Sequence, residues 1–130
     1  MKANIRVLSV GSEESIRTIY GALFGRCEYE LITAAKYREL FAIPVHEDIQ
    51  IAVLNDTLSR EELAAVAQLI RGRWPPARIL VVRIKVPSID DALYDDCVLP
   101  GLPPELLFAA IARLADDPRQ LVRGLRLWEC

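Results

Sequence analysis

Polar or glycine residues follow several of the apolar runs that the sequence marks as strands. Gly11-Ser12 follows the first run, Asn55-Asp56 the third and Arg83 the fourth, while the last run ends at Leu99 and Pro100. In a parallel sheet such positions meet beyond the carboxyl ends of the strands, where ligands collect. We therefore expect these residues to line any site. Ser12 and Arg83 are the groups there that could bind an anion.

No catalytic constellation accompanies these positions in the sequence. Ser12 and Ser59 stand where helices begin and have no histidine beside them, so both are better explained as helix caps than as nucleophiles. The aspartate pairs at 90–91 and 95–96 lack the glycine and glutamate of a calcium loop. The sequence has no Gly-rich phosphate loop. We expect a protein that is not an enzyme and that has no metal or cofactor.

The cysteines do not indicate a disulfide or zinc site. Cys27, Cys97 and Cys130 are widely spaced, form no CxxC pair, and have a single histidine, His46, to join them. The odd number and wide spacing of the cysteines favour free, reduced thiols in a reducing compartment.

Composition places the 130 residues with compact globular domains, since 52% are hydrophobic and 26% are charged. A formal net charge of −2 is too balanced to attract nucleic acid or anionic lipid strongly. The start of the chain lacks a signal-type apolar stretch, and no apolar run approaches the ~20 residues of a membrane span. We expect a cytoplasmic protein with no nucleic-acid or membrane partner.

Short apolar runs alternate with helical patterns along the chain. The predicted strands are Ile5–Val10, Tyr29–Thr33, Ile49–Leu54, Ile79–Val82 and Cys97–Leu99. The predicted helices are 13–25, a short segment Tyr37–Phe41, one that begins at Ser59, about two turns within 88–94, and Glu105–Ala115. Pro44 stops the short segment, and Trp74-Pro75-Pro76 breaks the helix that begins at Ser59.

Two of the helices carry clear start signals and apolar stripes. Ser12 can cap the first, and Ser59-x-x-Glu62 has the capping-box spacing. Apolar residues recur at helical spacing in both helices and in the last one. The predicted stripes are Ile16, Ile19, Tyr20, Leu23 and Phe24; Leu63, Val66, Ala67 and Ile70; and Leu107, Phe108, Ile111 and Leu114.

Alternating strands and helices predict a parallel sheet with helices on both faces, because parallel strands need crossover connections. The predicted fold is a flavodoxin-like three-layer α/β sandwich whose five strands have the order 2-1-3-4-5. The helix between the fourth and fifth strands is shortened. Residues 1–115 form the domain, and residues 116–130 form a C-terminal extension.

Two segments resemble the response-regulator receiver domain, the CheY-like phosphoacceptor domain of two-component signalling. Leu99–Leu107, LPGLPPELL, is similar to the family's Lys-Pro segment and Pro-Glu-Leu-Leu helix start. Ile49–Ser59, IQIAVLNDTLS, is similar to its strand-Asp-x-x-Leu-Pro passage. The resemblance covers residues 4–115, with both segments in the family's order.

The resemblance implies a phosphoryl-transfer pocket whose chemical groups are replaced here. A working receiver has an acidic pair after strand 1, an acceptor aspartate after strand 3, a hydroxyl after strand 4 and a lysine after strand 5. Those positions are held here by Val10-Gly11-Ser12, Asn55, Arg83 and Leu99. Asparagine cannot form an acyl phosphate as a carboxylate does. A shift of one residue would make Asp56 the acceptor, still without its helpers.

These replacements predict a pseudo-receiver, that is, a phosphorylation-independent interaction module of a bacterial phosphorelay pathway that binds a protein partner. The alternative is a small anionic-ligand binder or enzyme that uses the strand-end crevice. Arg83 either occupies the pocket, paired with Asp56, Glu13 or Glu14, or is an ordinary surface arginine.

The extension after residue 115 combines apolar and basic residues. Leu121, Val122, Leu125 and Trp128 are the interface candidates, interspersed with three arginines. Apolar side chains of this kind need a surface to cover. We expect the extension to pack on its own domain or to form a homodimer contact.

Overall fold

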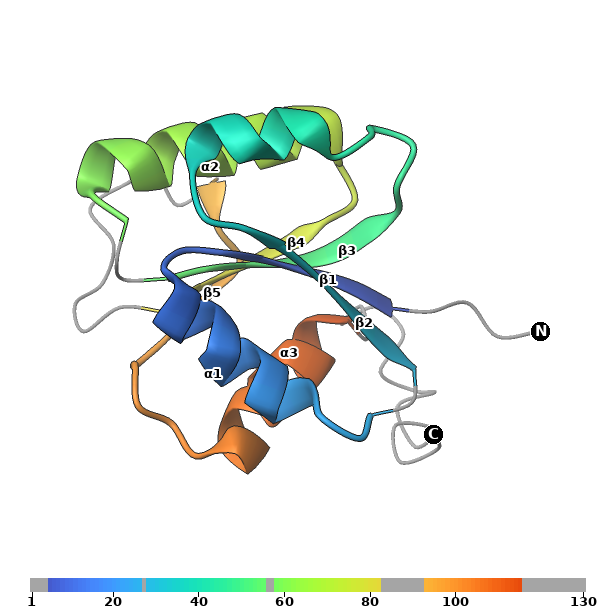
Figure 1. Cartoon of the computed structure of the whole chain (residues 1–130), viewed down its shortest axis with the longest axis vertical. Coiled ribbons are helices and arrows are strands. Elements are labelled where there is room, and N and C mark those ends of the chain that lie inside the picture. The colour runs from blue at the N-terminus through green and yellow to red at the C-terminus, as the bar shows by residue number, and fades with distance from the viewer. Residues whose placement is uncertain (1–4, 27, 56–57, 83–92, 116–130) are drawn as a thin grey trace.

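A single five-stranded parallel sheet in the order β2-β1-β3-β4-β5 forms the centre of the computed structural model (Figure 1). The structure describes residues 5–26, 28–55, 58–82 and 93–115. The strands are β1 (Ile5–Val10), β2 (Tyr29–Ala34), β3 (Ile49–Leu54), β4 (Arg78–Val82) and β5 (Asp96–Val98). The helices are α1 (Glu13–Leu23), the 3₁₀ helix η1 (Tyr37–Ala42), α2 (Arg60–Arg73) and α3 (Pro104–Ala115).

The helices cover both faces of the sheet, so the predicted three-layer sandwich and strand order are confirmed. Figure 1 shows α1 and α3 on one face and α2 with η1 on the other. Along β3 the side chains alternate between two cores. Ile51 and Val53 pack with α1 and α3, whereas Ala52 and Leu54 pack with α2 and η1. Because both faces are buried, the central strands are almost wholly apolar.

The two predicted helix starts are confirmed. The Ser59 Oγ accepts from the Glu62 N–H at 3.1 Å, and the Glu62 carboxylate accepts from the Ser59 N–H at 3.0 Å. This reciprocal capping box satisfies two backbone donors that a helix leaves without partners at its start.

The buried face of α1 is narrower than predicted. Ile19, Ala22 and Leu23 are its buried residues, whereas Tyr20 is 56% and Phe24 is 72% exposed. The expectation that Tyr20 and Phe24 face inward was wrong. At about 100° per residue, both lie more than a quarter turn from the centre of the strip that meets the sheet.

Two element ends also differ from the predictions. Helix α1 ends at Leu23 because Gly25, with a φ of 80°, adopts the left-handed conformation that ends many helices. Strand β5 ends at Val98, which leaves Leu99 outside the sheet and 59% exposed. The short helix predicted within 88–94 lies mostly outside the described residues, as does the extension 116–130.

A hydrogen-bonded junction fixes the start of β4 beside β5. The Asp95 N–H donates to the Ile79 carbonyl, and the Ile79 N–H donates to the Asp95 Oδ2, both at 2.8 Å. The same carboxylate oxygen lies 3.2 Å from the guanidinium of Arg71 near the end of α2. The carboxylate therefore joins the sheet to the helical layer above it.

Candidate functional site

The carboxyl ends of β1 and β3 lie side by side at the centre of the sheet. Val10 is paired with Leu54, the Asn55 N–H donates to the Val10 carbonyl at 3.1 Å, and Gly11 donates to the Ala34 carbonyl at 3.1 Å. The residues after the two strands are therefore held together by backbone hydrogen bonds. This is the crevice position expected for ligands in such sheets.

Asn55 directs its side-chain amide toward β1. Its Nδ2 donates to the Val10 carbonyl at 3.0 Å and approaches the Ser9 Oγ at 3.4 Å, and the residue is 4% exposed. The amide N–H group thus acts as a buried donor to the backbone. An ionised carboxylate has no proton to donate, so an aspartate in this orientation would place negative charge against a carbonyl oxygen.

Gly11 occupies a position that has no room for a side chain. Its φ is 153°, and an added Cβ would lie 2.7 Å from the Ser15 Oγ and 2.8 Å from the Asn55 Cβ. Contacts below 3.0 Å require a neighbour to move. In this backbone conformation, position 11 therefore has no space for the acidic residue that a receiver carries after its first strand.

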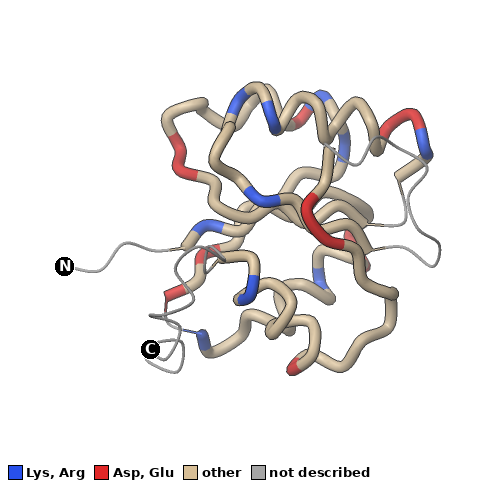
Figure 2. Tube along the Cα trace, turned by 180° about the vertical axis from the view of Figure 1, so that it is seen from behind, with Lys and Arg blue, Asp and Glu red and all other residues tan. Residues whose placement is uncertain are grey.

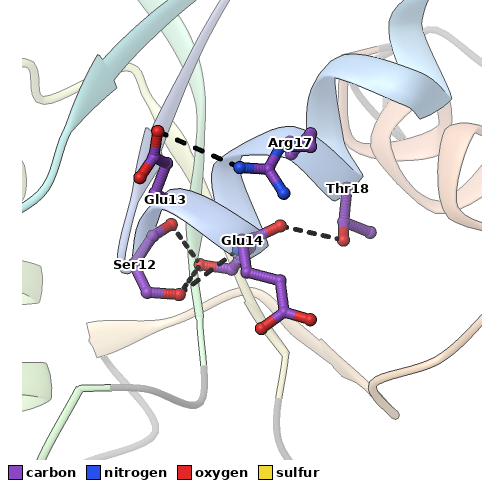
Figure 3. A network of polar contacts seen from close by, with 6 residues as sticks. Ser12, Glu13, Glu14, Arg17 and Thr18 are labelled. Carbon is purple, nitrogen blue, oxygen red and sulfur yellow. Dashed lines mark hydrogen bonds and ion pairs between the residues drawn. The ribbon is translucent and has the colours of Figure 1, made fainter.

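Ser12 caps α1, as Figure 3 shows. Its Oγ accepts from the Ser15 N–H at 3.3 Å, while the Ser15 Oγ donates to the Ser12 carbonyl at 2.9 Å. Farther along, the Glu13 carboxylate lies 3.9 Å from the Arg17 guanidinium, one turn away on the same helix. The hydroxyl of Ser12 is therefore engaged by the helix that it begins.

Leu99 and Pro100 follow β5 at the same edge of the sheet. Because β4 lies between β3 and β5, these residues are two strands away from Asn55. Leu99 presents an exposed apolar side chain and brings no positive charge to the edge. Of the predicted pocket residues, the structure thus brings Gly11, Ser12 and Asn55 together, while Asp56 and Arg83 lie outside the described residues.

Ser9 and Ser15 belong to this site although sequence reasoning did not single them out. Ser9 is fully buried within the apolar β1 and faces the Asn55 amide. Its signal in the sequence is a hydroxyl in an otherwise apolar inner strand, since buried polar groups usually have a buried partner. Ser15 carries no comparable signal because serines are common in the first turn of helices.

Within the described ranges, no group of three or more His, Cys, Asp or Glu side chains could hold a metal ion. Cys97 is a half-buried thiol, and Cys27 and Cys130 lie outside those ranges. Across the same residues, no helix is both long and apolar enough to cross a membrane.

Comparison with known proteins identifies the fold. No family model and no curated protein matches the sequence. Among solved structures, a response regulator from Thermotoga maritima has a TM-score of 0.71 at 18% identity, over 88% of this chain and 99% of that one. The chemotaxis response regulator CheY4 of Vibrio cholerae has a TM-score of 0.70 at 17% identity, over 86% and 99%.

A third similar structure is the signal receiver domain of an HD domain-containing protein from Pseudomonas fluorescens. Its TM-score is 0.71 at 13% identity, over 92% of this chain and 98% of that one. Nearly the whole of each of these chains is matched. The protein therefore has the CheY-like receiver fold.

Proposed function

We propose that this chain, which has the fold of response-regulator receivers, is a phosphorylation-independent interaction module of two-component signal transduction. It acts by presenting a surface to a protein partner, and it needs neither a metal nor a cofactor. The observation that carries the proposal is the buried Asn55 amide, which donates to the Val10 carbonyl at the position expected for an acceptor carboxylate.

The described part of the pocket supports this proposal at two points. An amide held as a donor is a poor nucleophile toward a phosphoryl group, and Gly11 supplies no anionic oxygen for magnesium. A side chain at Gly11 would also collide with Asn55 and Ser15. Restoring the chemistry thus requires more than a single substitution.

Loss of phosphorylation changes how such a domain can signal. A switch needs a charge or ligand that stabilises one of two conformations more than the other. Without an acceptor, binding to the partner is governed by the amounts of the two proteins. We place the module in the bacterial cytoplasm, with a protein rather than a nucleic acid as its partner.

Treatment with magnesium and acetyl phosphate, followed by intact-mass measurement, tests the proposal. We expect no stable gain of one phosphoryl group, while a phosphorylatable receiver treated in parallel shows one. A gain that disappears in Asp56→Asn contradicts the proposal, because Asp56 would then be the acceptor.

The anionic-ligand alternative would use Ser12 and Arg83. The Ser12 hydroxyl already accepts a hydrogen bond from the start of α1, so the geometry does not favour it. A thermal-shift series with inorganic phosphate and with nucleotides separates the two functions, since a ligand of the folded state raises the melting temperature. The interaction module predicts no shift.

A further inference from the structure

Helix α1 carries an exposed apolar patch on the side that faces away from the sheet. Tyr20 and Phe24 lie one turn apart with ring centroids separated by 6.1 Å, and both are more than half exposed. Gly21 lies between them in sequence. We call Tyr20, Gly21 and Phe24 the α1 patch.

Gly21 leaves an open space beside the two rings. Among the described residues, no atom of another element lies within 4 Å of where its Cβ would be. A glycine in a helix interior costs about 0.5–1 kcal/mol relative to alanine, and it allows another chain to approach the helix closely. Two exposed aromatic rings beside such a gap form a surface to which an apolar segment can bind.

Helix α3, the last described element, lies on this side of the molecule. Figure 1 shows α1 and α3 adjacent on one face of the sheet. The Phe108 ring of α3 lies 5.2 Å from the Tyr29 ring and 4.1 Å from the Arg26 guanidinium, just beyond the end of α1. The described chain ends at Ala115 of α3, on the face of the sheet that α1 also covers.

The extension has apolar residues that suit this patch. They are Leu121, Val122, Leu125, Leu127 and Trp128. We propose that residues 119–128 dock on the α1 patch of their own domain, with Leu125 and Trp128 as the anchors. Burial of these side chains together with Tyr20 and Phe24 removes apolar surface of both from water, which stabilises the docked state.

Position in the fold distinguishes the α1 patch from the other exposed aromatic pair, because basic residues lie near both. Arg17 and Arg26 lie near the α1 patch, while Tyr37 and Phe41 of η1 lie beside Lys36 and Arg38, with the Arg73 guanidinium 5.8 Å from the Phe41 ring. Figure 2 shows that the α2 and η1 layer carries acidic as well as basic residues. That layer covers the face of the sheet opposite to α3, with which the described chain ends, so the α1 patch is the aromatic pair on the face that α3 shares.

Cross-linking from Cys130 tests the docking. In a background with Cys27→Ser and Cys97→Ala, a second cysteine is introduced either at Gly21 in α1 or at Gly72 in α2. Both glycines are helical and have no other element within 4 Å of an added Cβ, but their helices cover opposite faces of the sheet. A short bis-maleimide then joins the new cysteine to Cys130.

Docking predicts an intramolecular cross-link that forms several-fold faster in Gly21→Cys than in Gly72→Cys. It also predicts that Leu125→Ala with Trp128→Ala lowers the Gly21→Cys rate several-fold, since proximity then depends only on the tether. Equal rates in the Gly21→Cys and Gly72→Cys variants contradict the proposal. A cross-link from Gly21→Cys that forms only between two chains contradicts it too, because the extension would then bind a second copy.

Discussion

The side-chain Nδ2 of Asn55 donates a hydrogen bond to the backbone carbonyl of Val10 across 3.0 Å. The two residues come from the ends of adjacent parallel strands, and Asn55 is almost fully buried. The amide therefore cross-links β1 and β3 at the position where the receiver resemblance expects a reactive carboxylate. The Asn55 side chain therefore has a structural role at this position.

Replacing this amide with a carboxylate destabilises the domain. In Asn55→Asp, an ionised oxygen faces the Val10 carbonyl in a buried site, and we expect a loss of about 1–3 kcal/mol in the free energy of unfolding at neutral pH. Urea denaturation measures the loss. A variant as stable as the parent at neutral pH would show that the amide does not hold the strands together.

The cost of Asn55→Asp depends on pH with a defined sign. Burial raises the pKa of the introduced carboxyl above its value in the unfolded chain. The loss relative to the parent is therefore small below the unfolded-state pKa, where the protonated acid can donate to the carbonyl, and it grows as pH rises through the folded-state pKa. Asn55→Ala, which has no titrating group, provides the control, and its loss does not change over this interval.

A side chain at Gly11 also destabilises the fold. An alanine Cβ at position 11 would lie less than 3.0 Å from atoms of Ser15 and Asn55. The backbone φ of 153° at this position is also unfavourable for any residue with a side chain, at a cost on the order of 1–3 kcal/mol. We expect Gly11→Ala to lower the melting temperature and Gly11→Asp to lower it further. Gly72→Ala is the matched control, because the added Cβ enters open space in a helix. We expect this substitution to raise the free energy of unfolding by up to about 1 kcal/mol.

The overall fold was predictable because its signals are local and repeat along the chain. The apolar β3, the Ser59 capping box and the alternation of strands with helices each indicated the observed element. The inward placement of Tyr20 and Phe24 was wrong because periodicity shows which residues share a face but does not show how wide the contact with the sheet is.

The candidate site was predictable only as a position on the sheet. That Gly11, Ser12 and Asn55 meet follows from the strand order, which the alternating pattern indicates. The direction of the Asn55 amide and the role of Ser9 depend on contacts between residues 46 and 45 positions apart in the chain. Such contacts leave no periodic signal in a single sequence.

The capping box of α2 supplies a further measurable effect. Ser59→Ala removes the acceptor of the Glu62 N–H, and we expect a loss of about 1 kcal/mol in the free energy of unfolding. Ser59→Asp keeps an acceptor at the start of the helix and should recover most of the loss. If Ser59→Ala leaves urea denaturation unchanged, the cap does not stabilise α2.

Asp95 provides a test of the junction between β4 and β5. Asp95→Ala leaves the buried N–H of Ile79 without its side-chain acceptor and removes the partner of Arg71, so we expect a loss of about 1–3 kcal/mol. Asp95→Asn retains an oxygen that can accept from Ile79 and should cost less. Thermal unfolding of the two variants shows whether the hydrogen bond outweighs the ion pair, and equal losses would favour the ion pair.

The last prediction concerns removal of residues 117–130. If Leu125 and Trp128 cover Tyr20 and Phe24, the deletion exposes both rings. It also removes the large apolar area that the tryptophan side chain buries. Loss of a fully enclosed tryptophan costs about 3–5 kcal/mol in the free energy of unfolding. Loss of a partly enclosed one should therefore lower the melting temperature by several degrees. The shortened chain should elute from a size-exclusion column as a monomer, like the parent.

Tyr20→Ser with Phe24→Ser provides the control for this deletion. With the patch removed, the same deletion should have little further effect on the melting temperature. If the deletion lowers the melting temperature equally in both backgrounds, the extension stabilises the domain at another surface. If it changes neither the melting temperature nor the elution volume of the parent, the extension packs on no surface of this domain.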